Sequence, residues 1–295
     1  MKTESISPRY LDLDTWPTQD VVEAMLESQF AAVAAVKSQA EALARAAEAA
    51  ADRLGDTGRL VYVGAGTSGR LAVQDGVELG PTYGWGRERL VFALAGGMGA
   101  LSASAEDAED DGAKGAATMR EEGVGPQDVV IGLAASGTTP YTVAAIAEAR
   151  RLGALTIGMA NNGGTPLLEA AEHAICLETG GEFIAGSTRM KAGTAQKIAT
   201  NMLSTAIMVR LGRVYRGLMV DMRVSNAKLR DRGARIVAEV AGCPVETASA
   251  ALERSGGNIK LAALLALGLE AGAAEALLRA SKGNLRRALQ GRTAG

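Results

Sequence analysis

The sequence predicts an α/β protein with a doubly wound, mainly parallel sheet flanked by helices, followed by a small helical appendage. Five short apolar runs without alternation predict strands that are buried on both faces. Helical patterns lie between these runs, as the crossover connections of a parallel sheet require. The predicted strands are Leu60–Val63, Leu90–Leu94, Val129–Leu133, Leu155–Met159 and Ala174–Leu177.

Three regions are expected along the 295 residues, which suffice for one α/β core and a smaller unit. Residues 1–54 are expected to form an N-terminal extension with a long helix that packs on the core. Residues 55–242 contain all five predicted strands. Residues 243–295 are rich in alanine and leucine and are broken by glycines into short helices, which predicts a small helical domain.

Three longer helical segments are expected outside the crossovers. Gln19–Leu54 carries apolar residues at helical spacing and ends at Gly55, which predicts one long helix. The pattern is helical again over Arg189–Leu211 and over Leu218–Ala241. These last two helices are expected to cover the sheet or a partner subunit.

Composition excludes several classes of partner. The formal net charge is −2 and no basic stripe or acidic tail occurs, so neither nucleic acid nor a membrane surface is an expected partner. Cys176 and Cys243 lack the spacing of a zinc site or a disulfide framework and suit a reducing compartment. No signal peptide or membrane-spanning run is found, so a soluble cytoplasmic protein that binds a small molecule is expected.

The turn after the first predicted strand contains G-x-G-x-x-G at Gly64, Gly66 and Gly69. Alone, this pattern is a weak signal for a dinucleotide. Thr67 and Ser68 add hydroxyl groups at the start of a predicted helix, where backbone N–H groups and the helix dipole favour an anion. We therefore expect Gly66, Thr67 and Ser68 to bind a phosphate monoester, while a simple helix cap remains the alternative.

A dinucleotide site is disfavoured by the end of the second predicted strand. A protein that binds a nicotinamide cofactor carries an acidic residue at this position, which accepts hydrogen bonds from the ribose hydroxyls. In this chain the strand ends at Leu94 and continues as Ala95-Gly96-Gly97.

A second hydroxyl-rich turn follows the third predicted strand. Ser136, Gly137, Thr138 and Thr139 precede Pro140, which is well placed to begin a helix. Two such turns on one parallel sheet meet at its carboxyl edge. Together they predict a sugar-phosphate pocket.

Six stretches of the sequence resemble the N-acetylmuramic acid 6-phosphate etherases, a family with the sugar isomerase (SIS) fold. The similarity runs in order from about Thr3 to the C-terminal helices. The matching stretches are GAGTSGRL (Gly64–Leu71), PTYG (Pro81–Gly84), AEDAEDD (Ala105–Asp111), AASGTTPY (Ala134–Tyr141), GSTRMKAGTAQK (Gly186–Lys197) and NMLSTAIM (Asn201–Met208), with LMVDM (Leu218–Met222) after them.

The resemblance implies an enzyme of cell-wall amino sugar recycling that works as a homodimer without metal or organic cofactor. Such an enzyme cleaves the lactyl ether of its substrate to give N-acetylglucosamine 6-phosphate and D-lactate. It also implies that the C-terminal appendage is a small helical bundle. Glu78 aligns with the proton-donor glutamate of the family and Glu109 with its second catalytic glutamate.

This ether can be eliminated once the carbon next to the aldehyde loses its proton, so one base and one acid suffice. The chain has a single histidine, which makes carboxylates the natural candidates. We expect Glu109 to take the proton, and Glu78 to protonate the departing lactate oxygen and later to activate water. Without the resemblance, both would be read as solvated helical carboxylates.

Further binding residues are expected in the loop before the helix at Arg189. Glu182 and Ser187 lie in this loop, and Lys191 places a cation near the start of that helix. A helix cap with surface charges is the alternative interpretation.

The chain departs from the common family pattern at Val77, Leu79, Gly80 and Thr138. A sugar-phosphate aldose–ketose isomerase, which needs the same proton abstraction and phosphate pocket, is the alternative enzyme. A non-catalytic regulator that binds a sugar phosphate is a third possibility.

Ten residues separate Ser68 from Glu78, and a helix of that length spans ~15 Å, which exceeds a pyranose ring. We therefore expect the pocket to lie at a dimer interface, with a carboxylate or loop supplied by the neighbouring subunit.

Overall fold

A five-stranded parallel sheet forms the centre of the first of two compact units. The computed structural model describes residues 1–102 and 106–292. The strands lie in the order β2-β1-β3-β4-β5 and all neighbours are parallel, which confirms the predicted α/β class. Their bounds are β1 Leu60–Gly64, β2 Leu90–Leu94, β3 Val129–Leu133, β4 Leu155–Ala160 and β5 His173–Cys176.

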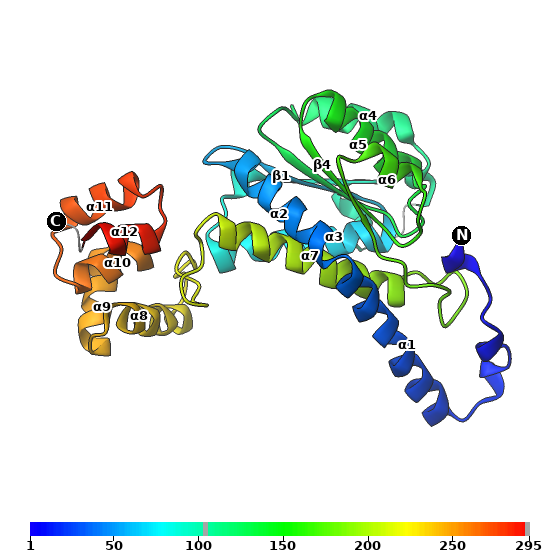
Figure 1. Cartoon of the computed structure of the whole chain (residues 1–295), viewed down its shortest axis with the longest axis horizontal. Coiled ribbons are helices and arrows are strands. Elements are labelled where there is room, and N and C mark those ends of the chain that lie inside the picture. The colour runs from blue at the N-terminus through cyan, green and yellow to red at the C-terminus, as the bar shows by residue number, and fades with distance from the viewer. Residues whose placement is uncertain (103–105, 293–295) are drawn as a thin grey trace. The chain divides into compact units, whose positions relative to one another are not determined.

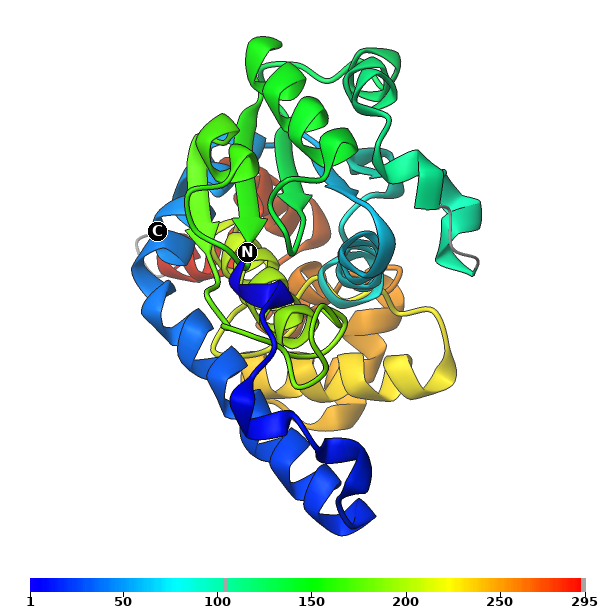
Figure 2. The same cartoon turned by 90° about the vertical axis from the view of Figure 1, so that its right-hand side faces the viewer.

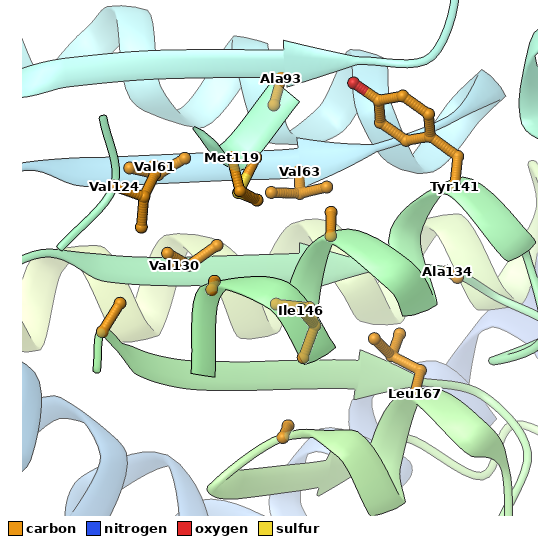
Figure 3. Packing of buried hydrophobic residues seen from close by; sticks show 14 of the residues in the cluster. Val61, Val63, Ala93, Met119, Val124, Val130, Ala134, Tyr141, Ile146 and Leu167 are labelled. Carbon is orange, nitrogen blue, oxygen red and sulfur yellow. The ribbon is translucent and has the colours of Figure 1, made fainter. Parts of the chain in front are cut away.

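Helices cover both faces of this sheet, as its apolar strands require. Figure 1 shows α4, α5 and α6 over one face and α2 over the other. The helices that lie wholly in this unit are α1 Thr18–Ser38, α2 Ala40–Leu54, α4 Gly112–Glu121, α5 Pro140–Arg151 and α6 Pro166–Ala170. Figure 3 shows Val61, Val63 and Val130 of the strands packed against Met119 of α4 and Ile146 of α5. All five of these side chains are fully buried or nearly so.

The single helix predicted over Gln19–Leu54 is wrong, because the chain breaks at Gln39 into α1 and α2. Gln39 leaves helical geometry at φ −102° and ψ 10°, and its Oε1 accepts a hydrogen bond from the Cys176 backbone N–H at 3.3 Å. After the break α2 packs against the sheet, whereas α1 extends away from it in Figures 1 and 2. The periodic pattern continues through Gln39, so the break coincides with this tertiary contact and not with a change in the apolar spacing.

The beginning of the chain also belongs to this unit. The Asn162 side chain after β4 donates to Thr3 Oγ1 at 3.1 Å, and Thr3 N donates to Asn162 Oδ1 at 3.4 Å. Figure 2 shows the first residues, in dark blue, beside the carboxyl ends of the strands. The N-terminal segment is therefore anchored at the edge where the predicted site lies.

The second compact unit consists of residues 77–87 and the chain from Ile207 onward. The boundaries therefore fall inside two helices, α3 Gly66–Tyr83 and α7 Lys191–Arg210. The remaining helices of this unit are α8 Ala227–Ala241, α9 Val245–Arg254, α10 Ile259–Ala266, α11 Ala271–Ala280 and α12 Leu285–Arg292. The predicted boundaries after residues 54 and 242 stay predictions.

The helix predicted to begin at Leu218 begins instead at Ala227. Tyr215 and Leu218 pair through backbone hydrogen bonds, and Asn226 caps the helix by accepting from Leu229 N at 2.9 Å. A buried ion pair supports this unit, since Lys260 Nζ lies 2.5 Å from Asp221 Oδ2. Burial raises the pKa of Asp221 and lowers the pKa of Lys260, while their mutual attraction opposes both changes.

Within the described residues, no helix combines the length and apolar character that crossing a membrane requires.

Candidate active site

The turns after β1 and β3 lie next to each other at the carboxyl edge of the sheet. The chain passes from β1 outward to β2 and returns on the other side of β1 to form β3. Ligands of open α/β sheets bind at such a reversal. Gly64 is in register with Leu133, so the two hydroxyl-rich turns leave the sheet side by side. We call residues 65–69 the β1 turn and residues 134–139 the β3 turn.

The β1 turn leads directly into α3, which begins at Gly66. Gly66 adopts φ +51°, a left-handed conformation that a residue with a Cβ takes only at a cost. Gly69 N donates to Ala65 O at 3.0 Å and starts the helical hydrogen bonds. The N–H groups before it belong to the first turn, where helix geometry provides no internal acceptor. This is the arrangement that binds anions in other proteins.

The Glu109 carboxylate lies directly beside the β1 turn. A Cβ built on Gly66 would be 2.8 Å from Glu109 Oε1. Glu109 ends a 3₁₀ turn over Glu106–Glu109, and Asp111 then caps α4 by accepting from Lys114 N at 2.8 Å. Ala105, the first residue of the AEDAEDD stretch, lies outside the described residues. The fold thus brings a half-buried carboxylate to the predicted phosphate turn.

Glu78 lies in the C-terminal part of α3 and its side chain is exposed. It belongs to the second unit, whereas Glu109 belongs to the first. Of the residues that depart from the common pattern beside it, Val77 is exposed and Leu79 is buried. The role of Glu78 stays a prediction.

The β3 turn holds its hydroxyl groups through local hydrogen bonds. Thr138 N donates to Ser136 Oγ at 3.1 Å, and Ser136 Oγ lies 3.5 Å from Thr139 Oγ1. Gly137 adopts φ +74°, and a Cβ there would lie 2.3 Å from Thr165 Oγ1. Pro140 is the first residue of α5, as predicted. The Thr138 side chain is exposed and is available to a ligand.

Glu182 and Lys191 meet at the beginning of α7. Glu182 is fully buried, and its carboxylate accepts hydrogen bonds from Lys191 N at 3.0 Å and Ala192 N at 2.9 Å. The Lys191 ammonium donates to the Gly181 carbonyl. Both side chains are therefore engaged within the protein. Their predicted contact with substrate stays a prediction.

Ser187 lies in the tight turn before α7, where Met190 N donates to Ser187 O at 3.1 Å. The first turns of α3 and α7 lie close together, since a Cβ built on Gly193 would lie 3.7 Å from Thr67 Cγ2. Ser187 is half-buried and Thr67 is half-buried as well. The first turn of α7 is thus a neighbour of the β1 turn.

Two polar residues beside the candidate site, Asn161 and Gln196, were not predicted from the sequence. Ser68 Oγ donates to Gln196 Oε1 at 2.8 Å, and Gln196 Nε2 donates to Asn161 Oδ1 at 3.1 Å. A polar residue directly after the apolar run of β4 was the available signal for Asn161. Gln196 lies inside the helical pattern of α7, and its place in the matching stretch Gly186–Lys197 was the available signal.

A buried carboxylate, Asp75, lies further along α3. It accepts hydrogen bonds from Tyr62 Oη at 2.8 Å, Ser204 Oγ at 3.2 Å and Asn201 Nδ2 at 3.5 Å. Burial raises the pKa of Asp75, and these hydrogen bonds oppose the change. Asp75 ties α3 to β1 and α7.

A cavity of about 620 Å³ lies beside the β3 turn, and Thr138 contributes to its wall. The loop after β4 supplies Asn162 and Thr165 to the wall, and Lys2 and Glu178, which form an ion pair at 3.4 Å, also line the cavity. Within residues 1–102 and 106–292, no group of three or more histidine, cysteine, aspartate or glutamate side chains is arranged to hold a metal ion.

Comparison with family models supports the fold in two overlapping parts. Residues 40–150 match the model described as the glucokinase regulatory protein N-terminal SIS domain. Residues 112–206 match the SIS domain model.

Two solved structures share this fold at low sequence identity. A putative sugar-phosphate isomerase from Listeria monocytogenes superposes with a TM-score of 0.50 at 16% identity, covering 65% of this chain and 89% of its own. A putative phosphosugar isomerase involved in capsule formation from Bacteroides fragilis gives 0.51 at 17% identity, covering 68% and 95%. At this identity the likeness establishes the fold alone.

Curated relatives match over nearly the whole chain, and each is named N-acetylmuramic acid 6-phosphate etherase. The protein of Deinococcus radiodurans is 50% identical, covering 98% of this chain and 95% of its own length. Those of Rubrobacter xylanophilus and Cronobacter sakazakii are 47% and 45% identical, covering 97% and 98% of this chain and 95% and 97% of their own lengths. The resemblance found in the motifs is thereby confirmed, and the chain belongs to the N-acetylmuramic acid 6-phosphate etherase family.

Proposed function

We propose that this chain is a carbon–oxygen lyase that converts N-acetylmuramic acid 6-phosphate and water to N-acetylglucosamine 6-phosphate and D-lactate, in the recycling of cell-wall amino sugar. The name carried by its relatives supports the substrate. The observation in the structure that carries the proposal is the Glu109 carboxylate beside Gly66, where the β1 turn begins α3. A base at the edge of an anion-binding turn suits proton abstraction from a phosphorylated sugar.

The β1 and β3 turns hold the phosphate of this substrate. Gly66, Thr67 and Ser68 belong to the first turn of α3, whose N–H groups and dipole favour an anion. Ser136, Gly137, Thr138 and Thr139 contribute from the neighbouring β3 turn. Glu182 and Ser187 in the loop before α7, and Lys191 at the start of α7, support this pocket.

In the proposed reaction Glu109 takes the proton from the carbon next to the aldehyde of the open-chain sugar. The released electron pair forms a carbon–carbon double bond as the bond to the lactate oxygen breaks, and Glu78 protonates that oxygen. Glu78 then removes a proton from water, which adds at the former ether carbon, and Glu109 returns its proton to the neighbouring carbon. One water is consumed, and no metal or organic cofactor is needed.

The enzyme works as a homodimer, with part of each pocket supplied by the neighbouring subunit. The exposed face of α1 supports this, because Val22, Leu26, Phe30 and Val33 lie at helical spacing and are 54%, 66%, 69% and 53% exposed. A stripe of large apolar side chains on one face of a helix is typical of a protein contact. Light scattering after size exclusion tests this, and a fully active monomer would contradict it.

The cytoplasm is the proposed compartment. Cys176 and Cys243 are both free thiols, which suits a reducing environment.

The function is tested by D-lactate release from N-acetylmuramic acid 6-phosphate in ¹⁸O-labelled water. We expect lactate to be released and the label to enter the sugar at the former ether carbon. Aldose–ketose conversion of a sugar phosphate without lactate release would instead identify an isomerase. Sugar-phosphate binding that raises the melting temperature without any turnover would identify a regulator.

A further inference from the structure

Three buried polar side chains form a continuous hydrogen-bond chain between the β1 turn, α7 and the loop after β4. Ser68 Oγ lies 2.8 Å from Gln196 Oε1, and Gln196 Nε2 lies 3.1 Å from Asn161 Oδ1. Asn161 Nδ2 then donates to Leu177 O at 3.0 Å. Ser68, Gln196 and Asn161 are 7%, 0% and 1% exposed. An unmade hydrogen bond here is costly, because water does not replace a lost partner in a buried site.

The direction of this chain is fixed by its inner end. A backbone carbonyl only accepts hydrogen bonds, so Asn161 must turn its amide nitrogen toward Leu177 O. Its oxygen then faces Gln196, which must present its own amide nitrogen and turn its oxygen to Ser68. The reversed arrangement would place Asn161 Oδ1 against Leu177 O, two acceptors without a proton between them. Ser68 is therefore the donor in its bond to Gln196.

A donated proton is not available to a second acceptor. The oxygens of a phosphate dianion are acceptors, so they compete with Gln196 for the single hydroxyl proton of Ser68. If the Ser68 hydroxyl donated its hydrogen bond to a phosphate instead, Gln196 Oε1 would be buried without a donor.

The same chain joins the two phosphate turns. Asn161 N donates to Ala135 O in the β3 turn at 3.0 Å, and Asn161 Nδ2 also approaches Ala192 O in the first turn of α7 at 3.5 Å. Asn161 thus contacts the β3 turn and α7, and Gln196 connects it to the β1 turn. A substitution that breaks the side-chain bonds of Gln196 is therefore expected to weaken the connection between the two turns.

We propose that Gln196 and Asn161 are positioning residues for sugar-phosphate binding, and that the Ser68 hydroxyl acts through them rather than as a donor to the phosphate. This proposal rests on the proposed function. The phosphate receives its hydrogen bonds from the backbone N–H groups of the first turn of α3 and from the other hydroxyls of the two turns.

A double-mutant cycle tests this assignment, with Ser68→Ala, Gln196→Met and the double variant compared in KM and kcat. Each single change breaks the same chain, so each is expected to raise KM about tenfold with a much smaller change in kcat. The KM of the double variant is expected to remain about tenfold above that of the wild type. A hundredfold rise, the product of two independent effects, would overturn the proposal.

Gln196→Glu supplies a pH readout that a simple packing role would not produce. An ionised carboxylate accepts from Ser68 but repels Asn161 Oδ1, whereas the protonated form donates to Asn161 as the amide does. Its KM relative to that of the wild type is expected to fall toward one as the pH is lowered. Gln196→Met is expected to show a constant ratio. Parallel behaviour of the two variants would contradict the proposal.

Gln39→Met is the control, because the Gln39 side-chain oxygen also accepts from a backbone group, the Cys176 N–H in β5, and this bond is not part of the chain from Ser68 to Asn161. It is expected to lower the melting temperature without changing KM. If Gln196→Met does not fold, Gln196→Glu takes its place in the cycle at neutral pH.

Binding of N-acetylglucosamine 6-phosphate by calorimetry separates this proposal from the proposed function. If the wild type binds this sugar phosphate but releases no lactate, the proposed function fails. The double-mutant cycle, measured as the Kd for this sugar phosphate, then still tests the hydrogen-bond chain. A Kd of the double variant about tenfold above that of the wild type supports the chain, and a hundredfold rise contradicts it.

Discussion

The two strand–turn–helix segments of the site, β1–α3 and β3–α5, hold their hydroxyl side chains in different ways. The β1 turn is held from outside, since Ser68 is tied to Gln196 and Asp75 further along α3 is tied to Tyr62 and Ser204. The hydroxyl groups of the β3 turn are held locally, by bonds among Ser136, Thr138 and Thr139. The backbone of this turn is held from the loop after β4 and from α6, since Asn161 N donates to Ala135 O and Leu167 N to Gly137 O, both at 3.0 Å.

The difference suits a site in which the Ser68 hydroxyl is fixed within the protein and the hydroxyls of the β3 turn meet the ligand. Buried networks rigidify the groups they join, whereas local hydroxyl bonds are exchanged readily for bonds to a ligand. Thr138 is exposed and Ser68 is buried, in agreement with this division.

Gly66→Ala is expected to have the largest effect among the turn variants. The new Cβ would lie 2.8 Å from Glu109 Oε1 and would strain a residue at φ +51°, so it displaces the proposed base. A displacement of about 1 Å can cost about 10²-fold in kcat. Lactate release measures the effect, and unchanged kcat in a folded variant would show that Glu109 is not placed by this contact.

Gly137→Ala is expected to act mainly on stability. Its Cβ would lie 2.3 Å from Thr165 Oγ1 at φ +74°, and overpacking of this kind costs about 1–3 kcal/mol of the free energy of unfolding. Urea denaturation measures this loss. Equal stability of Gly137→Ala and wild type would contradict a tightly built β3 turn.

Thr138→Ala tests the exposed member of the β3 turn. Because its hydroxyl is open to a ligand and the change removes no buried partner, we expect KM to rise about fivefold with kcat and melting temperature unchanged. An unaltered KM would exclude Thr138 from phosphate binding.

The smallest expected effects concern the dependence of stability on pH. A carboxylate in α5 and one in α3 contribute to this dependence with opposite sign. Hydrogen bonds from Arg151 and Arg120 lower the pKa of Glu148 in α5 to about 2, so its contribution to stability is present above about pH 4.5 and is lost toward pH 2. In α3, burial raises the pKa of Asp75, so ionisation of Asp75 costs stability as the pH rises through that value.

Urea denaturation between pH 2 and pH 8 compares the two carboxylates. Glu148→Gln is expected to flatten the loss of stability on the acid side. Asp75→Asn is expected to resemble the wild type in acid and to gain stability relative to it near neutral pH. Changes of the same sign in both variants would contradict the assigned environments.

Most of the sheet could be predicted, because each strand is an uninterrupted apolar run between helical patterns. The break at Gln39 and the late start of α8 could not, since both depend on contacts with residues distant in sequence or on a local cap that the apolar spacing does not reveal. The two hydroxyl-rich turns were visible in the sequence as well. The position of Glu109 beside Gly66 was not, because a run of acidic residues has the same pattern when it is merely solvated.

The central claim, that Glu109 is the base and Glu78 the acid, is tested most directly by deuterium exchange. N-acetylmuramic acid 6-phosphate is incubated in D₂O with Glu109→Gln or Glu78→Gln, and both deuterium next to the aldehyde and lactate release are followed. Glu78→Gln is expected to exchange the proton but to release lactate at least about 10²-fold more slowly than wild type. Glu109→Gln is expected to do neither, and exchange at the wild-type rate in Glu109→Gln would contradict the account.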